Sequence, residues 1–375
     1  MPPDRPTPLR LLVVLPSWVG DCVMATPTLR LMREAFRGTF IGGLMRPGLD
    51  ELLAGAGFFD EVHVERAGGV MGPKFAAAKV RPRRYDTAIL FPNSFSTALI
   101  VRIAGIPRRI GYARDSRGLL LTESLKPPKT AKGDWAIVPA VDYYYTLAKR
   151  LLLPGGEPRG DAPLALPQGL FLELATTPEE ERAGEEILAK AGVRDGERLV
   201  MLNPGANKDW KRWPAERFAA LATHLHEHHG ARVLLNGSPA ESELIESIAG
   251  RAGCPVVALP RLGIRIGSLK AILRRCSLMV TNDTGPRHMA SAFGVPLITI
   301  YGPTDHRWAP IPTRANAPEV KLLADPTLPE TESANDHPDR CAIENVTLDS
   351  VRDAVDRLMV PSTDADPSRV SASRR

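Results

Sequence analysis

The chain has 375 residues, 43% hydrophobic and 24% charged, a composition typical of a soluble globular protein that is long enough for two domains. Its net charge of +5 suits anionic ligands or an anionic membrane surface, but no basic run is interleaved with aromatic residues as in nucleic-acid binding. No apolar run approaches the roughly 20 residues that span a bilayer. The four cysteines lack Cys-x-x-Cys spacing, which argues against both a disulfide framework and a thiolate zinc site.

The first predicted strand covers residues 10–15 and leads through the turn 16–21 into an apolar-periodic helix at 23–36. Asp21 stands where this helix begins. Two interpretations of Asp21 remain open: an N-cap, or a carboxylate that faces a cleft as a general base. We expect Pro27 to kink or restart the helix, because proline cannot donate the helical hydrogen bond.

Further elements follow in the N-terminal half. We predict strands at 40–44, 61–64, 85–91 and 106–112, and helices at 49–58, 97–104 and 135–153. Asn93 and Ser94 come after one of these strands and could bind sugar hydroxyls or simply cap the next helix. The stretch 154–169 is rich in proline and glycine and marks the approach to an interdomain linker.

A second β-α series follows the linker. We predict strands at 199–202, 232–236, 255–259, 277–280 and 296–301, and helices at 178–192, 215–229, 241–249, 268–275 and 348–358. The loop 203–214 combines small residues with basic side chains, so a lysine there could clamp a pyrophosphate or only belong to a solvated turn. Glu241 could cap its helix or accept hydrogen bonds from ribose hydroxyls.

Four histidines lie near the end of the helix predicted at 215–229: His224, His226, His228 and His229. His224 and His228 are four residues apart and could share a metal ion. No carboxylate completes this spacing, however, and histidines at a helix end also suit the helix dipole. We therefore predict no metal site.

The turn 281–288 joins a buried strand to a helix that begins near His288. Open α/β sheets bind ligands at such turns, where free N–H groups and the positive end of the helix dipole favour an anion. Pro286 suits the first helical position, and His288 can point at the same anion. The alternative is that Asp283 or Thr284 is an ordinary N-cap.

The two series predict an α/β protein of two doubly wound, Rossmann-like domains that face a cleft. We expect an N-terminal domain at 9–170, a second domain at 175–345, a closing helix at 346–360 and a disordered tail at 361–375. Neither G-x-G-x-x-G nor G-x-x-x-x-G-K-[ST] occurs, which disfavours a nicotinamide-dependent enzyme and a P-loop NTPase.

Taken together, these loops resemble glycosyltransferase family 9, the lipopolysaccharide heptosyltransferases. The matching segments are 16–21, 90–95, 104–107, 211–214, 281–285 with His288, and 301–303. The first two segments most resemble the heptosyltransferase II branch of the family.

The resemblance implies a GT-B fold with the acceptor domain first and the nucleotide-sugar domain second. It also implies an inverting transfer of heptose from ADP-L-glycero-β-D-manno-heptose to an inner-core heptose of a lipid A–linked oligosaccharide. Alternatives are a transferase of the same fold with another acceptor, as in heptosyltransferases I and III, or with another nucleotide sugar. A non-catalytic nucleotide-sugar-binding protein is disfavoured, because it would not need Asp21 in addition to the donor turn.

The resemblance also assigns roles by position. Asp21 resembles the general base of the family. The residues that resemble its donor-binding set are Ala206, Asn207, Lys211, Glu241, Asp283, Thr284, Gly285 and His288. The candidate acceptor-binding residues are Trp18, Gly20, Asn93 and Ser94. Arg287 departs from the family pattern and could touch phosphate or point to solvent.

Two effects oppose each other at the expected base. The helix N-terminus would lower the pKa of Asp21 and weaken it as a base, whereas burial against Trp18 in the cleft would raise that pKa. The sequence does not say which effect is larger.

No cofactor is required under this interpretation, because Lys211 and the helix N-terminus at Thr284 would stabilise the leaving pyrophosphate, although Mg²⁺ could still associate with the ADP moiety. The expected partners are the ADP-heptose donor and a lipid A–core acceptor at the membrane surface, with no nucleic acid. We expect a cytoplasmic monomer and leave open a peripheral association with the inner face of the inner membrane.

Overall fold

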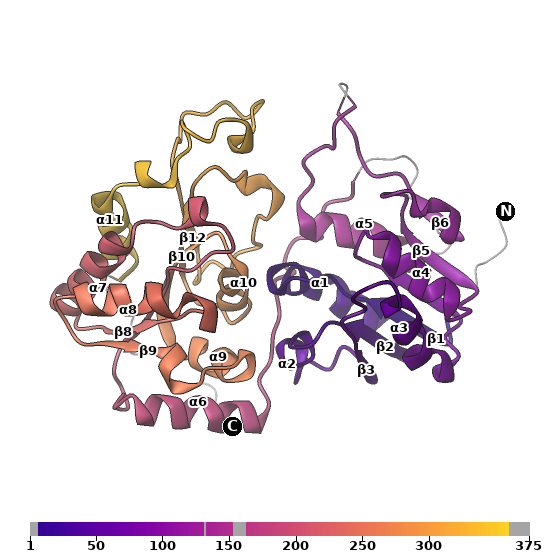
Figure 1. The fold of residues 1–375 in the computed structure, drawn as a ribbon, viewed down its shortest axis with the longest axis horizontal. Coiled ribbons are helices and arrows are strands. Elements are labelled where there is room, and N and C mark those ends of the chain that lie inside the picture. Colours follow the sequence, from indigo (N-terminus) through magenta and orange to yellow (C-terminus); the bar gives the residue numbers. More distant parts are fainter. Residues whose placement is uncertain (1–6, 131–132, 153–162, 360–375) are drawn as a thin grey trace, which may run out of the picture.

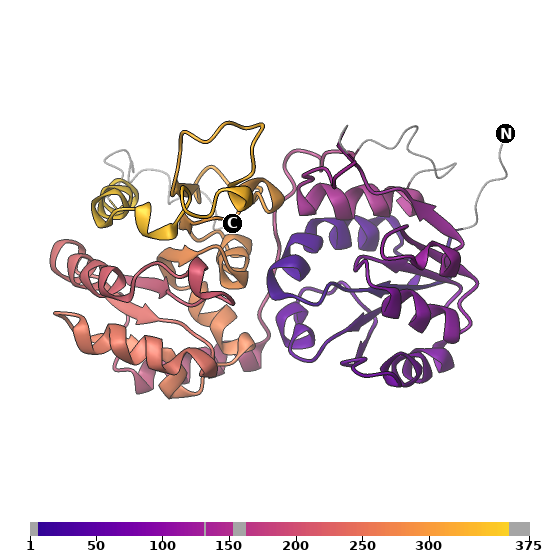
Figure 2. The same ribbon diagram turned by 45° about the horizontal axis from the view of Figure 1, so that its top comes forward.

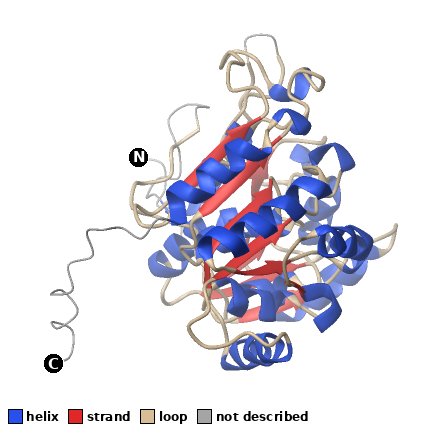
Figure 3. Ribbon diagram, turned by 90° about the vertical axis from the view of Figure 1, so that its left-hand side faces the viewer, coloured by secondary structure: helices blue, strands red, loops and turns tan. Residues whose placement is uncertain are grey.

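The computed structural model describes residues 7–130, 133–152 and 163–359, which form two lobes side by side (Figure 1). Each lobe contains a six-stranded parallel sheet with helices packed on its faces (Figures 1 and 2). Seen from the side of the C-terminal lobe, helices lie in front of the strands (Figure 3). The predicted α/β fold of two doubly wound domains is confirmed. The predicted tail, 361–375, and part of the predicted linker approach, 154–169, lie outside the described residues.

The N-terminal sheet has the strand order β3-β2-β1-β4-β5-β6. Its strands are β1 Arg10–Val14, β2 Phe40–Met45, β3 Glu61–Val64, β4 Thr87–Leu90, β5 Arg108–Tyr112 and β6 Glu123–Leu125. The helices of this lobe are α1 Val19–Ala35, α2 Leu49–Leu53, α3 Gly72–Val80, α4 Phe95–Ile103 and α5 Ala140–Leu152.

The C-terminal sheet has the order β12-β11-β10-β7-β8-β9, which is the same topology read from the other edge. Its strands are β7 Leu199–Asn203, β8 Arg232–Leu235, β9 Val256–Ala258, β10 Cys276–Asn282, β11 Leu297–Tyr301 and β12 Glu319–Leu323. Its helices are α6 Pro178–Lys190, α7 Ala215–His229, α8 Ser242–Arg251, α9 Ile266–Leu273, α10 Gly285–Ala292 and α11 Leu348–Met359.

In each sheet the chain reverses its direction of winding between two neighbouring strands, β1 and β4 in one lobe and β7 and β10 in the other. Val14 pairs with Leu90, so the turns after β1 and β4 begin side by side. Likewise Asn203 pairs with Thr281, which brings together the turns after β7 and β10. Ligands of doubly wound sheets bind at such reversal points, beyond the carboxyl ends of the strands.

Alternating residues of the central strands pack into different cores. In β1, Leu11 and Val13 belong to one apolar cluster, whereas Leu12 belongs to another on the opposite face of the sheet. In β7, Met201 and Leu202 divide in the same way. Because the cluster that contains Leu11 also contains Met201, one apolar core continues from the first lobe into the second.

The joint between the lobes also contains a buried cation. Helix α1 packs against α10, and α2 packs against α9. Lys270 of α9 is fully buried, and its ammonium group donates to the carbonyl oxygens of Ala54 and Ala175 at 3.1 and 2.9 Å. It also pairs with Glu180 at 2.9 Å. These contacts tie α2 of the first lobe, the connecting chain and α6 of the second lobe together.

The structure excludes a restart of the helix at Pro27, one of the two predicted outcomes, because α1 runs continuously through this residue. Proline leaves the carbonyl oxygen of Val23 without its helical donor. The hydroxyl of Thr26 donates to that oxygen at 2.6 Å instead. The local replacement of one hydrogen bond explains why the helix is not interrupted.

Several element boundaries also differ from the prediction. Helix α2 ends at Leu53, before Gly55 and Gly57, which both have positive φ. Helix α5 begins only at Ala140, and α3, β6 and β12 were not predicted. Strand β12 was missed because its sequence, Glu-Val-Lys-Leu-Leu, lacks the apolar pattern of a buried strand.

Candidate active site

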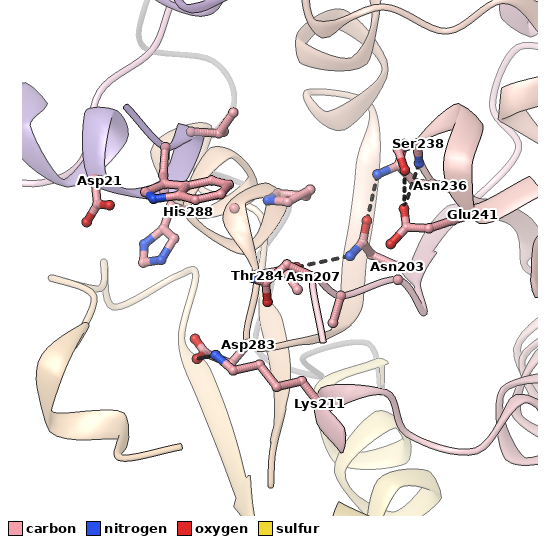
Figure 4. Close-up of a pocket in the computed structure, with 18 of the residues that line it drawn as sticks. Asp21, Asn203, Asn207, Lys211, Asn236, Ser238, Glu241, Asp283, Thr284 and His288 are labelled. Atoms are coloured by element: carbon pink, nitrogen blue, oxygen red, sulfur yellow. Dashed lines mark hydrogen bonds and ion pairs between the residues drawn. The ribbon is translucent and has the colours of Figure 1, made fainter. Parts of the chain in front are cut away.

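A cavity of about 570 Å³ lies where the two lobes face each other (Figure 4). Its walls come from the start of α1 and from the turns after β7, β8 and β10. The lining residues that carry polar side chains are Asp21, Asn203, Asn207, Lys211, Asn236, Ser238, Glu241, Asp283, Thr284 and His288. Both strand-reversal points therefore contribute to one cavity, and all predicted donor-binding residues line it.

Two helix N-termini from different lobes meet at this cavity. A side chain at Gly20 would approach the ring of His288 to 2.8 Å, and one at Gly285 would approach Val19 to 3.1 Å. Two glycines thus allow α1 and α10 to come close at their first turns. Because the positive ends of both helix dipoles are directed toward the same space, the cavity suits an anionic group.

A second cavity of about 520 Å³ adjoins the first and lies mainly in the N-terminal lobe. Trp18, Asp21 and Met24 line both cavities. Asp21 is the one carboxylate, among the described residues, that both cavities share. A molecule in either cavity can therefore reach the Asp21 carboxylate.

Burial is the dominant influence on Asp21. It raises the pKa of this carboxyl group above its usual range, while a hydrogen bond from the Tyr144 hydroxyl to Oδ1, at 3.4 Å, opposes the rise. Asp21 lies in the first turn of α1 and makes no cap, because the N-cap position is Trp18. Burial thus proves to be the larger of the two opposing effects on this carboxyl group, although Trp18, beside it on both cavity walls, is itself 66% exposed. The raised pKa makes Asp21 a stronger base than an ordinary aspartate.

The loop after β7 is held by a buried asparagine that the sequence analysis did not select. Asn282 donates to the carbonyl of Pro204 at 2.7 Å and accepts from the backbone N–H of Trp213 at 3.2 Å. This fixes both ends of the segment that carries Lys211. The Lys211 ammonium group lies 3.5 Å from Asp283 at the edge of the cavity (Figure 4).

Polar groups across three strand ends form a second network (Figure 4). Asn203 donates to the Thr284 hydroxyl at 3.1 Å and accepts from Asn236 at 2.6 Å. Glu241 uses Oε2 to accept from the N–H and hydroxyl of Ser238, which leaves its Oε1 for a ligand. Glu241 lines the cavity, and its side chain makes a capping box with Ser238 in the short turn Pro239–Glu241. It makes no side-chain hydrogen bond that caps α8, so the predicted cap of its own helix is wrong.

His288 lies in the first turn of α10 and is buried. Burial and the neighbouring Arg287 hold its pKa well below the usual range, so the imidazole is neutral at physiological pH. Its Nδ1 has no hydrogen-bond partner within the described part of the chain. A neutral histidine with a free ring nitrogen can hydrogen-bond a ligand but cannot supply a full positive charge.

Both expectations for Arg287 are wrong. The side chain neither lines the cavity nor points to solvent but is fully buried. Its guanidinium group forms a two-point ion pair with Glu319 of β12, at 2.6 and 3.2 Å, and contacts Asp283 at 3.3 Å. Arg287 thereby positions Asp283, which in turn contacts Lys211.

The second cavity includes the predicted acceptor-binding residues Trp18, Asn93 and Ser94, whereas Gly20 lines only the first. Ser94 also caps α4 by accepting from the N–H of Thr97. The side-chain oxygen of Asn93 accepts from the Tyr143 hydroxyl at 3.1 Å and from Arg117 at 3.3 Å, which leaves its amide N–H groups for a ligand.

Arg117 is one of the residues that the sequence analysis missed. It is fully buried, and burial lowers its pKa to about 10. It donates to the carbonyl groups of Tyr112 and Pro92 and so holds the turn after β4. Arg46 and Arg114, also missed, line the second cavity with Trp135, and the Arg114 guanidinium lies 4.3 Å from the centre of the Trp135 ring. Nothing in the local sequence of these isolated arginines signals a site.

The structure also brings together three side chains that could ligate a metal ion. His224, His229 and Asp356 offer three ligand atoms within 4.8 Å of one another, on α7 and α11 and outside both cavities. The carboxylate that joins these histidines, Asp356, comes from a distant helix and not from the local spacing of His224 and His228.

Comparison with known proteins gives consistent results. Residues 76–337 match the model of glycosyltransferase family 9 (heptosyltransferase). The chain is similar to lipopolysaccharide heptosyltransferase 2 of Salmonella typhimurium, with 28% identity over 84% of this chain and 88% of that protein. It is also similar to the structure of E. coli ADP-heptose lps heptosyltransferase II, with a TM-score of 0.73 and 25% identity over 93% and 98% of the chains. The fold is shared with a glycosyl transferase family 9 structure from Veillonella parvula, with a TM-score of 0.78 and 22% identity over 93% and 97%.

Proposed function

The chain belongs to glycosyltransferase family 9 and is a glycosyltransferase, and from this premise we propose that it moves heptose from ADP-heptose to a heptose of the lipopolysaccharide inner core. The lobe at 9–170 binds the acceptor in this proposal, and the lobe at 175–345 binds the donor. Helix α11, in the segment 346–360, closes the second lobe.

One observation carries the proposal: the Asp21 carboxylate lies on the wall shared by the two cavities. A transferase must bring two substrates to one base, whereas a protein that only binds a nucleotide sugar needs a single cavity. The raised pKa of Asp21 suits a group that has to accept a proton.

The first cavity suits a nucleoside diphosphate. The N-termini of α1 and α10, together with Lys211, favour the pyrophosphate. Glu241 keeps one carboxylate oxygen for ribose hydroxyls. Neutral His288 can donate a hydrogen bond to a phosphate oxygen without changing its charge.

In the proposed reaction, Asp21 takes the proton of the acceptor hydroxyl as its oxygen forms a bond with the anomeric carbon of the donor. The bond between that carbon and the pyrophosphate oxygen breaks, and its electron pair leaves with ADP. The attack comes from the face opposite the leaving group, which inverts the anomeric centre. Lys211 and the helix N-termini stabilise the charge that develops on the pyrophosphate.

Lys211 gives the first test of donor binding. We expect Lys211→Ala to weaken ADP and ADP-heptose binding by about 10- to 100-fold, because a charge-assisted contact with phosphate is lost. Isothermal titration calorimetry with ADP, ADP-heptose, UDP and GDP measures the effect, and the unaltered protein should prefer ADP and ADP-heptose. Lys208→Ala is the control, since Lys208 is exposed in the same loop and does not line the cavity.

Two results would contradict the assignment. Tighter binding of UDP or GDP than of ADP would keep the transferase class but exclude the donor. Unchanged ADP affinity in Lys211→Ala would remove Lys211 from the site.

The second cavity suits an anionic saccharide. Arg46 and Arg114 supply positive charge, and the aromatic rings of Trp18 and Trp135 supply flat surfaces against which sugar rings can pack. These groups support an acidic core oligosaccharide as the acceptor.

No helix among the described residues is long and apolar enough to cross a membrane. We propose that the protein meets its lipid-linked acceptor through an apolar and basic surface around the start of α3. Val70 is 97% exposed, and Phe75 is 61% exposed beside the exposed Lys74. A smaller cavity lined by Ala67 and Ala76 shares Ser17, Arg46, Ser94 and Ser96 with the acceptor cavity, so this surface adjoins the acceptor site.

Vesicle binding tests this surface. We expect the protein to co-sediment with vesicles of anionic phospholipid more than with neutral ones. The double substitution Val70→Ser and Phe75→Ser should weaken this binding by about tenfold, because two exposed apolar side chains no longer enter the interface. Leu9→Ser, at an exposed apolar residue near the amino end of β1, is the control. Equal binding by the double variant and the control would exclude this surface.

A further inference from the structure

We propose that His224, His229 and Asp356 form a binding site for a divalent transition metal ion, with Zn²⁺ as the best fit. The Nε2 atoms of both histidines lie 2.7 Å from the same oxygen, Oδ1 of Asp356. Nothing in the proposed transfer reaction uses these residues, and they lie outside both substrate cavities.

The fold brings these groups together from two helices. His224 and His229 lie on the last turns of α7, which is followed by its C-cap residue Gly230 at φ +60. Helix α11 packs against α7 through buried Val351, Ala354 and Val355. Asp356 follows directly after this apolar stripe and therefore faces the end of α7.

The donor set matches the preferences of zinc. Imidazole nitrogen and carboxylate oxygen bind Zn²⁺ at about 2.0–2.2 Å, and tetrahedral sites combine three or four such ligands. Ligand atoms around a tetrahedral ion are about 3.3 Å apart at these bond lengths, so the present contacts need to widen by about half an ångström. Water or His228, whose ring centre lies 4.5 Å from that of His224, can complete the coordination.

The ring nitrogens that contact Asp356 also suit metal binding. In the present arrangement, Asp356 can accept a hydrogen bond from an Nε2–H of each histidine. Both contacts use Nε2, so the contact with Asp356 does not involve Nδ1 of either ring. An imidazole that carries its proton on Nδ1 presents the Nε2 lone pair to a metal ion.

Partial burial favours the site as well. The His224 and His229 side chains are 11% and 13% exposed, whereas Asp356 is 47% exposed. An ion can enter from solvent on the Asp356 side and then lose most of its contact with water. Bound there, it would link α11 to α7 and stabilise the end of the C-terminal lobe without touching either substrate cavity.

Metal titration of the full, tag-free chain tests the proposal. After treatment with a chelator and dialysis, the protein should bind one Zn²⁺ with a dissociation constant in the micromolar range or below in competition with a chromophoric chelator. Co²⁺ should give the absorption spectrum of a four-coordinate site. Saturating Zn²⁺ should raise Tm by a few degrees, because it binds only the folded chain.

Three variants locate the ion. Asp356→Asn and His224→Gln should each weaken Zn²⁺ binding by at least about tenfold and abolish the rise in Tm. His226→Ala is the matched control, since His226 is exposed on the same helix end and bonds elsewhere, with Nδ1 3.4 Å from the carbonyl of Ala231. The rate of sugar transfer should be the same in all three variants.

Stoichiometric binding that is lost in both site variants but kept in His226→Ala establishes the site. The absence of Zn²⁺ binding by the unaltered chain would overturn the proposal, and the three residues would then form only a hydrogen-bonded cluster. Binding that survives unchanged in both Asp356→Asn and His224→Gln would overturn it equally. If one of these variants does not fold, the other still decides the outcome.

Discussion

Asp21→Asn should lower the rate constant of sugar transfer by about two to four powers of ten, because the acceptor hydroxyl loses its general base. ADP affinity should stay close to that of the unaltered protein, since the proposed donor-binding side chains come from the other lobe. Transfer is measured by the release of ADP under saturating donor, and affinity by calorimetry. An Asp21→Asn enzyme that kept most of its activity would show that another group removes the proton.

The pH profile gives an independent check on Asp21. Its base form is lost as the pH falls through the pKa, and burial raises that pKa, so the acid limb should lie above the pH range of an ordinary aspartate. Tyr144→Phe removes the hydrogen bond that opposes the rise. This variant should therefore move the acid limb to still higher pH while it keeps the aromatic packing. A limb that does not move would separate the pH dependence from Asp21.

As the pH rises through the pKa of Asp21, stability should fall while activity rises. The folded-state pKa of Asp21 is raised, so the folded protein binds this proton more tightly than the unfolded chain does. Ionisation of Asp21 therefore destabilises the fold as the pH rises from the unfolded-state pKa through the folded-state pKa. At neutral pH the neutral asparagine removes this penalty. Asp21→Asn should thus be at least as stable as the unaltered protein, which distinguishes loss of chemistry from loss of folding.

Features that repeat along the chain could be predicted from sequence. Apolar runs such as 277–280 and 296–301, with a small-residue turn between them, were sufficient to predict a β-α-β unit and an anion-binding turn. The predicted donor-binding residues line one cavity because they all follow the carboxyl ends of neighbouring strands. Strand order was not predictable in this way, since it depends on pairings between distant segments, such as β7 with β10.

Features that depend on one distant partner could not be predicted. Arg287 is adjacent in sequence to site residues, yet its position is determined by Glu319, 32 residues away on β12. Asp356 completes a cluster that begins at His224, 132 residues earlier. The local sequence indicates only a turn residue at Asn282, and its structural role comes from its contacts with Pro204 and Trp213. In each case the role of the side chain depends on long-range contacts, and no local sequence pattern predicts such contacts.

The pair of Arg287 and Glu319 is the most consequential of these contacts. Both side chains are almost completely inaccessible, at 0% and 2%. Burial acts to raise the pKa of Glu319, but the ion pair with Arg287 and the Thr299 hydroxyl outweigh it and keep the carboxylate ionised. Removal of one member of such a pair leaves an uncompensated buried charge, whereas an apolar replacement of both members is tolerated much better.

Glu319→Gln should therefore reduce the free energy of unfolding by about 3–5 kcal/mol at neutral pH, as measured by chemical and thermal denaturation. The folded-state pKa of Glu319 is lowered, so this loss should shrink as the pH falls through that pKa and the unaltered glutamate also becomes neutral. Glu344→Gln, at an exposed glutamate of the same lobe, is the control and should change stability little.

The double variant Arg287→Met and Glu319→Met should recover most of the lost stability, because no buried charge is left unpaired. It should still bind ADP more weakly than the unaltered protein, since Asp283 loses the contact that positions it beside Lys211. If stability and ADP affinity were both restored, the ion pair would serve the fold alone. Stability without affinity would show that the buried pair also organises the donor site.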